Sequence, residues 1–211
     1  MKRLLLLSVF LFSNHIFANQ WVNINSINEK SPDLNIISSD IENTFLEFKL
    51  GGFNQKSVFI NNVEYTKISF PESASNLDFG YPDLPTISKS VIIPNNGLMN
   101  VEIIEQDYIE IDNMYIAPSK GNISREIDPL TINYFFNDVY LSDSSYPENI
   151  AELREPYILR DFRGQTVTFS PFSYNPITKK LRVYTYLKVR IYKDGIDQRN
   201  ILNDKTFSKI D

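Results

Sequence analysis

The sequence contains no cysteine and only one histidine, His15, among its 211 residues. Without cysteine no disulfide can brace the fold, so a hydrophobic core must supply the stability. If His15 leaves with an N-terminal targeting segment, the mature chain has neither residue. Cys/His and Ser/His/Asp nucleophilic catalysis by this chain alone are then excluded. Zinc sites built on imidazole or thiolate are excluded as well, and we expect neither a metal nor a cofactor.

The first 18 residues have the layout of a secretory signal peptide. A basic start precedes an apolar run over residues 4–12, and the small residue Ala18 precedes the expected cleavage point. The apolar run is too short to span a bilayer, and no other segment of the sequence is a membrane candidate. The sequence therefore predicts a periplasmic or extracellular protein with no stable membrane anchor, whose mature chain starts near Asn19.

The charge balance is acidic. Lysine and arginine together number 21 against 26 acidic residues, for a formal charge of −5. Loss of Lys2 and Arg3 with the signal peptide brings the charge to −7. Such a surface is a poor partner for nucleic acid. No block of like charges occurs, so the balance is that of an ordinary solvated surface.

The clearest structural pattern is a long alternating segment near the C-terminus. One face carries Leu181, Val183, Thr185, Leu187, Val189 and Ile191. The other face carries Arg182, Tyr184, Tyr186, Lys188, Arg190 and Tyr192. A period of two is that of a strand, so we predict a strand whose first face belongs to the core. The turn over residues 175–179 would join it to a partner strand through Val167 and Phe169.

Shorter alternating runs fill the rest of the chain. Residues 21–27 are expected to form a first strand, and Asn61-Asn62 a hairpin turn of type I′. The proline-containing segment 79–94 predicts a crossing loop that leads into a short strand at residues 90–93. Further strands are expected at residues 101–105, 108–111 and 115–117, and residues 147–154 could form one or two helical turns. Together these predict an all-β fold, one antiparallel β-sandwich, for which a jelly roll is one arrangement.

Two basic residues, Lys120 and Arg125, flank a glycine between Pro118 and Pro129. This composition favours an exposed loop. Taken by themselves, the residues indicate an ordinary solvated loop with two surface charges.

Several motifs resemble the propeptide of gingipain-type cysteine peptidases. They are GYPDLP at 80–85, VIIP at 91–94, PSKGNISR at 118–125, YILRDFRGQ at 157–165 and PFSYNP at 171–176. The resemblance covers roughly residues 45–192 and stops where the family's peptidase domain would begin. It divides the chain into a signal peptide (1–18), an N-terminal strand and loop (19–44), the propeptide β-sandwich (45–193) and a linker or C-terminal tail (194–211).

The resemblance implies a folding aid and latency inhibitor rather than an enzyme. Its partner would be a gingipain-like peptidase domain, in cis or in trans, and the catalytic Cys and His of that domain are missing from this chain. In such zymogens a basic loop residue enters an acidic specificity pocket, and the matching position is Arg125, with Lys120 as the second choice. A guanidinium offers a carboxylate a planar fork and two charge-assisted hydrogen bonds.

Other features allow more than one interpretation. The cluster of Arg160, Asp161 and Arg163 is a second anchoring patch or, as we favour, a small surface ion-pair network. Gly164 is expected to supply a backbone geometry closed to other residues. The stripe of Tyr184, Tyr186 and Tyr192 would suit a partner protein or a glycan.

Two rival functions remain open. One is a secreted β-sandwich module that binds glycan or a cell-surface protein. The other is a carboxylate-only enzyme or calcium site, with pairs such as Asp138 and Asp143 or Glu152 and Glu155. In a chain so rich in acids chance pairs are expected, and no spacing matches an EF-hand loop, so this second rival is the weaker.

Overall fold

A computed structural model describes residues 19–202. The predicted signal peptide and residues 203–211 of the predicted tail lie outside the described residues. Within the described part the strands are β1 (Gln20–Asn23), β2 (Asp33–Ser39), β3 (Asn43–Lys49), β4 (Gly52–Ile60), β5 (Val63–Ser69), β6 (Ala74–Ser75), β7 (Pro85–Ile92), β8 (Gly97–Ile111), β9 (Ala151–Leu153), β10 (Tyr157–Leu159), β11 (Phe162–Phe169), β12 (Phe172–Asn175) and β13 (Lys180–Ile196). Two short 3₁₀ helices, η1 (Pro129–Thr131) and η2 (Asp138–Leu141), lie between β8 and β9.

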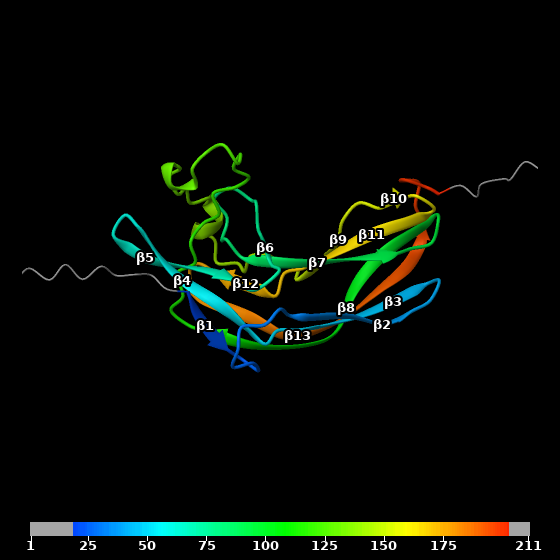
Figure 1. The fold of residues 1–211 in the computed structure, drawn as a ribbon, viewed down its shortest axis with the longest axis horizontal. Helices are drawn as coiled ribbons and strands as arrows, with labels where there is room; N and C mark the ends of the chain where they lie inside the picture. Colours follow the sequence, from blue (N-terminus) through cyan, green and yellow to red (C-terminus); the bar gives the residue numbers. More distant parts are fainter. Residues whose placement is uncertain (1–18, 203–211) are drawn as a thin grey trace, which may run out of the picture.

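The strands form three sheets. One five-stranded sheet has the order β10-β11-β7-β6, with β9 also paired to β11, and a second has the order β12-β13-β3-β2, with β8 also paired to β13. Figure 1 shows these two sheets one above the other, each extending along the long axis of the molecule, and a smaller sheet, β1-β4-β5, lies at one end. The strand pairings are antiparallel. The predicted all-β, sandwich-like fold is confirmed.

The core lies between the two larger sheets and continues under the small one. The rings of Phe48 on β3 and Phe169 on β11 stack with centroids 5.9 Å apart. Phe53 on β4 meets Phe172 on β12 edge to face at 5.3 Å. Each buried large side chain contributes about 1.5–3 kcal/mol by leaving water, which is how a chain without cysteine stabilises its fold.

Strand β13 lies in the middle of the second five-stranded sheet, and one face of it is buried, as its alternation predicts. Its five predicted core residues, Leu181, Val183, Leu187, Val189 and Ile191, are each 0% exposed. The strand pairs with β3 on one edge and with β8 over most of its length on the other. The alternation is interrupted at Thr185, which is only half-buried, because a β-bulge separates Tyr184 from Tyr186.

The predicted partner strand of β13 is wrong. Val167 and Phe169 belong to β11 in the other sheet, and β12 pairs with β13 instead. Pro171 lies between β11 and β12 and has no N–H to donate to a ladder, so the strand breaks there and the chain crosses from one sheet to the other.

The predicted helical turns at residues 147–154 are also wrong. Ala151–Leu153 forms β9 and pairs with Val167–Phe169 of β11. The spacing of Glu148 and Glu152 suits one helix face, but an unpaired edge of β11 offers this segment hydrogen bonds that a short helix cannot match.

Local turn signals are confirmed where the backbone requires them. Asn61 and Asn62 have φ values of 50° and 63° and join β4 to β5 as the predicted hairpin. The strand expected at residues 90–93 is longer and begins at Pro85, because a strand's first residue tolerates a missing N–H. The two strands expected at residues 101–105 and 108–111 are one continuous strand, β8.

Candidate functional site

The segment between β8 and β9 carries the predicted basic residues away from the sheets. Figure 1 shows it as a green to yellow-green lobe that projects at one end of the long axis. We define the basic loop as residues 118–130 within this lobe. Residues 122 and 124–130 of this loop are exposed, so the predicted exposed loop is confirmed.

The base of the basic loop is fixed by main-chain hydrogen bonds. The Gly80 amide donates to the Ser119 carbonyl at 2.9 Å, and the Ser119 amide donates to the Tyr81 carbonyl at 2.7 Å. Gly80 has φ of +80°, and a Cβ there would lie 2.7 Å from the Phe135 ring. Only glycine satisfies both conditions, so the motif over residues 80–85 anchors the loop to the sandwich.

Aromatic rings stiffen the same base. Phe79 and Phe135 stack with centroids 5.3 Å apart, and Phe136 meets Tyr140 at 4.9 Å. The Tyr140 hydroxyl donates to the Ile116 carbonyl at 2.9 Å, and burial raises the pKa of Tyr140 well above its usual range. The base of the lobe is therefore packed against the sandwich, although residues 124–130 are exposed to solvent.

Arg125 occupies the corner of a tight turn in the exposed part of the basic loop. The Ile127 amide donates to the Ser124 carbonyl at 3.0 Å, which places Arg125 and Glu126 at the two central positions of a β-turn. The Arg125 side chain is exposed, and no hydrogen bond or ion pair holds its guanidinium among residues 19–202. Its donors are free to bind a partner.

Lys120 is engaged within the loop. Its Nζ donates to the Pro129 carbonyl at 2.7 Å and lies 4.2 Å from the centroid of the Tyr134 ring. Burial, with a smaller contribution from the nearby Lys67, lowers the pKa of Lys120. The ammonium closes the two ends of the loop on each other, which distinguishes it from Arg125.

Exposed large apolar side chains occur in the basic loop and in the segments 77–79 and 135–141. Their exposed fractions run from 47% to 88%, and they are Leu77, Phe79, Ile127, Leu130, Phe135 and Leu141. Exposed apolar side chains gathered in one region of a monomer mark an interaction surface more often than chance.

The predicted tyrosine stripe is not continuous. Tyr184 is only 6% exposed and lies against the Tyr108 ring, with centroids 5.8 Å apart. The bulge at Thr185 causes this, because it breaks the alternation that would keep Tyr184 and Tyr186 on one face. Tyr186 and Tyr192 are half-buried, and their role at an interface stays a prediction.

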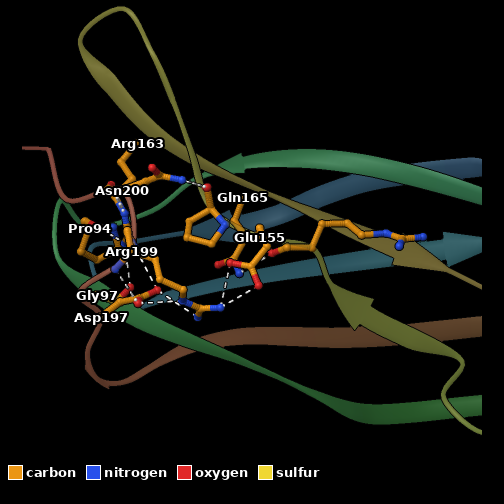
Figure 2. A network of polar contacts seen from close by, with 10 residues as sticks. Pro94, Gly97, Glu155, Arg163, Gln165, Asp197, Arg199 and Asn200 are labelled. Atoms are coloured by element: carbon orange, nitrogen blue, oxygen red, sulfur yellow. Dashed lines mark hydrogen bonds and ion pairs between the residues drawn. The ribbon is translucent and has the colours of Figure 1, made fainter.

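The predicted surface network of Arg160, Asp161 and Arg163 is wrong for Arg163, which is 0% exposed. All five of its N–H groups are used. Over 2.7 to 3.0 Å they donate to the carbonyl oxygens of Pro94, Gly97, Arg199 and Asn200 and to the carboxylate of Asp197. Figure 2 shows this network from close by, and Figure 1 shows β10 and β11 at the end of the sandwich opposite the lobe.

The sequence carried a signal for this burial. Arg163 falls in phase with Gln165, Val167 and Phe169, and all four are buried on the inner face of β11. The alternation of β11 therefore indicated an inward-facing arginine. What it could not indicate was the source of the acceptors, which lie 34 to 69 residues away along the chain.

The prediction for Gly164 is wrong in its reason. Its φ does not lie in the left-handed region, so the backbone does not require glycine. A Cβ would instead lie 2.8 Å from the Tyr157 ring on the neighbouring β10. Gly164 is small because an aromatic side chain crosses over it.

We define the strap as residues 195–202, which Arg163 holds against the sandwich. The strap lies within the segment predicted as a linker or tail. Its Asp197 amide donates to the Asn96 carbonyl at 2.8 Å, and its Leu202 amide donates to the Asn95 carbonyl at 3.1 Å. Hydrogen bonds from Arg199 lower the pKa of Asp197 to about 2.

One member of each carboxylate pair considered as an enzyme or calcium site is engaged in another contact. Asp143 accepts a hydrogen bond from Asn175 at 2.9 Å, and Glu155 binds Arg199 with both oxygens at 2.8 Å. In the part of the chain that the structure describes, no group of three or more acidic or histidine residues could hold a metal ion. No helix between residues 19 and 202 is long and apolar enough to cross a membrane.

Comparison with known proteins finds gingipains among the relatives of this chain. The sequence profile of the family Propeptide_C25 matches residues 25–210. Gingipain R1 of Porphyromonas gingivalis is 37% identical over 156 residues, which are 69% of this chain and 16% of that protein. Gingipain R2 of the same species is 32% identical over 182 residues, 85% of this chain and 25% of that protein. The chain thus spans a minor part of these relatives.

Solved structures agree with the sequence relatives. The complex of the pro- and mature domains of RgpB from P. gingivalis matches with a TM-score of 0.79 and 33% identity, covering 85% of this chain and 92% of that one. A structure that describes the zymogenic latency of gingipain K from P. gingivalis matches with a TM-score of 0.69, covering 84% of this chain and all of that one. At 13% identity, this second match shows the fold alone.

Proposed function

Since the chain belongs to the C25 propeptide family, we propose that it is the pro-domain of an exported gingipain-type cysteine peptidase, which it helps to fold and holds latent until it is removed. The match to an RgpB pro-domain over 85% of this chain supports the proposal. The layout of residues 1–18 supports export. The chain itself does no peptide hydrolysis, because the catalytic residues belong to the partner.

The geometry of Arg125 is the single observation that carries the inhibitory mechanism. Its guanidinium has no partner among residues 19–202 and stands at the corner of a turn on a packed base. In a pocket that excludes water, a guanidinium gains two charge-assisted hydrogen bonds from one carboxylate. Because the base of the loop is already ordered, less backbone conformational entropy is lost on binding. Arg125 therefore enters the specificity pocket of the peptidase and blocks the cleft.

Lys120 has a supporting role in this mechanism. Its ammonium is already bound to the Pro129 carbonyl and covered by Tyr134. To enter a pocket it would have to break both contacts, whereas Arg125 would break none. Lys120 thus keeps the loop closed while Arg125 makes the contact.

The exposed apolar residues around the loop complete the contact surface. Interfaces concentrate their binding energy in a few anchors surrounded by side chains that exclude water. Leu130, which belongs to the basic loop, is 88% exposed, and we expect it to exclude water beside the inserted arginine. The rival function as a glycan-binding module has less support, because the burial of Tyr184 removes the tyrosine platform that it requires.

An inhibition assay tests the proposal. The mature domain of gingipain R2 would cleave an arginine-linked fluorogenic substrate in the presence of the purified domain. Arg125→Ala should raise the inhibition constant roughly thirtyfold or more, which corresponds to a loss of about 2 to 5 kcal/mol for a desolvated, carboxylate-paired arginine. The inhibition constant of Arg125→Lys should lie between those of the parent and of Arg125→Ala, since an ammonium cannot form the two parallel hydrogen bonds of a guanidinium.

Arg154→Ala is the matched control, because it removes an exposed arginine that follows β9, outside the loop. It should inhibit as well as the parent. If Arg125→Ala also inhibits as well as the parent, insertion of Arg125 is wrong and another surface, such as Tyr186 and Tyr192, blocks the cleft. A parent domain that does not inhibit at all overturns the latency proposal.

A further inference from the structure

The strap contains an arginine whose two recognition groups are both occupied. A protease that cuts after arginine must bind the guanidinium and must reach the carbonyl carbon. The Arg199 guanidinium is bound to Glu155, with Nη1 2.8 Å from both carboxylate oxygens, and to Asp197, with Nε 2.9 Å from Oδ1. The Arg199 carbonyl accepts a hydrogen bond from Nη2 of Arg163 at 2.9 Å. Neither group is available while these contacts hold.

Arg163 controls this arrangement. Its guanidinium joins the strap to the segment that connects β7 to β8, since it donates both to Pro94 and Gly97 and to Arg199 and Asn200. The group is fully buried, and opening the strap would take away three of its five acceptors, including the carboxylate of Asp197 that balances its charge. Such a step is strongly unfavourable, and the strap should open rarely.

Further contacts fix the two sides of the Arg199–Asn200 bond. On the N-terminal side the Asp197 amide donates to the Asn96 carbonyl at 2.8 Å, and on the C-terminal side the side-chain amide of Asn200 donates to the Pro156 carbonyl at 2.6 Å. Proteases cut segments that are exposed and can extend into a cleft. A bond held on both sides must first be released by local opening of the strap.

We propose that the strap is a latch, closed by Arg163, that shields the Arg199–Asn200 bond from arginine-directed proteolysis, so that this bond is cut only after the latch opens. In the reaction water adds to the Arg199 carbonyl carbon, the C–N bond to Asn200 breaks, and a carboxylate and a new amine result. The inference goes beyond the proposed function and does not depend on whether Arg125 enters a pocket.

Limited proteolysis with trypsin tests the latch, with intact-mass spectrometry to assign each early cut. In the parent, cleavage after Arg125 should be at least about a hundred times faster than cleavage after Arg199, because only the second requires local opening. Arg163→Met should speed cleavage after Arg199 by at least about tenfold and leave cleavage after Arg125 unchanged. Arg154→Met is the matched control and should change neither rate.

Three results would overturn the latch. They are a parent cut after Arg199 as fast as after Arg125, an Arg163→Met protein that is folded in a urea titration yet no easier to cut after Arg199, and an Arg154→Met protein with the same gain as Arg163→Met.

If Arg163→Met does not fold, hydrogen exchange of the parent protein tests the latch instead. The amides of Asp197 and Leu202 should then exchange far more slowly than unstructured peptide, and exchange at the unstructured rate rules the latch out. The inhibition assay with Arg125→Ala is a separate measurement, so failure of either proposal leaves the other intact.

Discussion

Arg125 and Arg199 lie at opposite ends of the same sandwich, and their surroundings are opposite as well. Arg125 stands at the corner of a turn with an exposed guanidinium that no residue of the described chain binds. Arg199 has its guanidinium bound by two carboxylates and its carbonyl bound by the buried Arg163. The difference teaches that exposure of a loop does not decide whether an arginine is available. What decides is whether the chain supplies acceptors in reach.

Strand β13 is the longest strand of the sandwich whose two ends carry these arginines. The largest predicted effect comes from a substitution in its buried face. Val189 is 0% exposed between Leu46 on β3 and Ile103 on β8. Val189→Asp buries a charge without a partner and should destabilise the domain by more than about 4 kcal/mol. Circular dichroism and urea titration should show an unfolded chain that has lost both inhibition and the protection of Arg199. A variant as stable as the parent would contradict the assignment of this core face.

The second prediction separates the two ends by their contribution to stability. Arg163→Met removes the five hydrogen bonds that the buried guanidinium donates to four carbonyls and to the carboxylate of Asp197, so it should lower the free energy of unfolding by about 3 to 5 kcal/mol. Arg125→Ala removes no contact within the described residues and should change that free energy by less than about 0.5 kcal/mol. Urea titrations of the two variants give both values. Equal effects would refute the contrast drawn between the two arginines.

A third prediction uses one glycine at each end. Gly80→Ala places a Cβ 2.7 Å from the Phe135 ring at φ of +80°, and Gly164→Ala places one 2.8 Å from the Tyr157 ring. Each should cost about 1 to 3 kcal/mol of stability. Gly80→Ala should weaken inhibition and Gly164→Ala should not, because only the first disturbs the base of the basic loop. Inhibition constants that change equally would show that the two ends are coupled.

The smallest effect is a pH dependence confined to the strap. Hydrogen bonds from Arg199 lower the pKa of Asp197 from 3.8 to about 2 in the folded protein. The unfolded chain therefore binds this proton first, so the carboxylate stabilises the fold above about pH 4. That contribution is lost as the pH falls towards 2. Hydrogen exchange at Asp197 and Leu202, compared with Ile191 in β13, should show the strap losing protection first. Asp197→Asn should abolish this pH dependence, and a parent strap with equal protection at pH 6 and pH 2 would contradict the prediction.

Local patterns predicted much of the fold. The period of two in β13 identified its five buried residues, and Asn61-Asn62 identified a hairpin, because both depend on geometry within a few residues. The helical turns expected at residues 147–154 failed for the converse reason. Their segment became β9 because an edge of β11 was available to it, and no local spacing reports a distant unpaired edge.

Arg125 and Arg163 show the same difference between what local patterns predict and what distant segments decide. The resemblance and the proline-bounded composition placed Arg125 on an exposed loop, and the structure has it there. The same kind of reasoning placed Arg163 on the surface, where it is not. Its phase with Val167 and Phe169 pointed inward, but an arginine is buried only if acceptors are supplied, and these come from residues 94–97 and 197–200.

By itself the sequence determined the class of fold, the core face of its longest strand, and the absence of cysteine from any chemistry of this chain. Only the tertiary structure decided that β11 and β12 belong to different sheets, that Tyr184 is buried, and that Arg163 binds the strap. The physical reason is that side-chain period and turn propensity act over a few residues. Hydrogen-bond acceptors and unpaired strand edges are supplied by segments that meet only when the chain has folded.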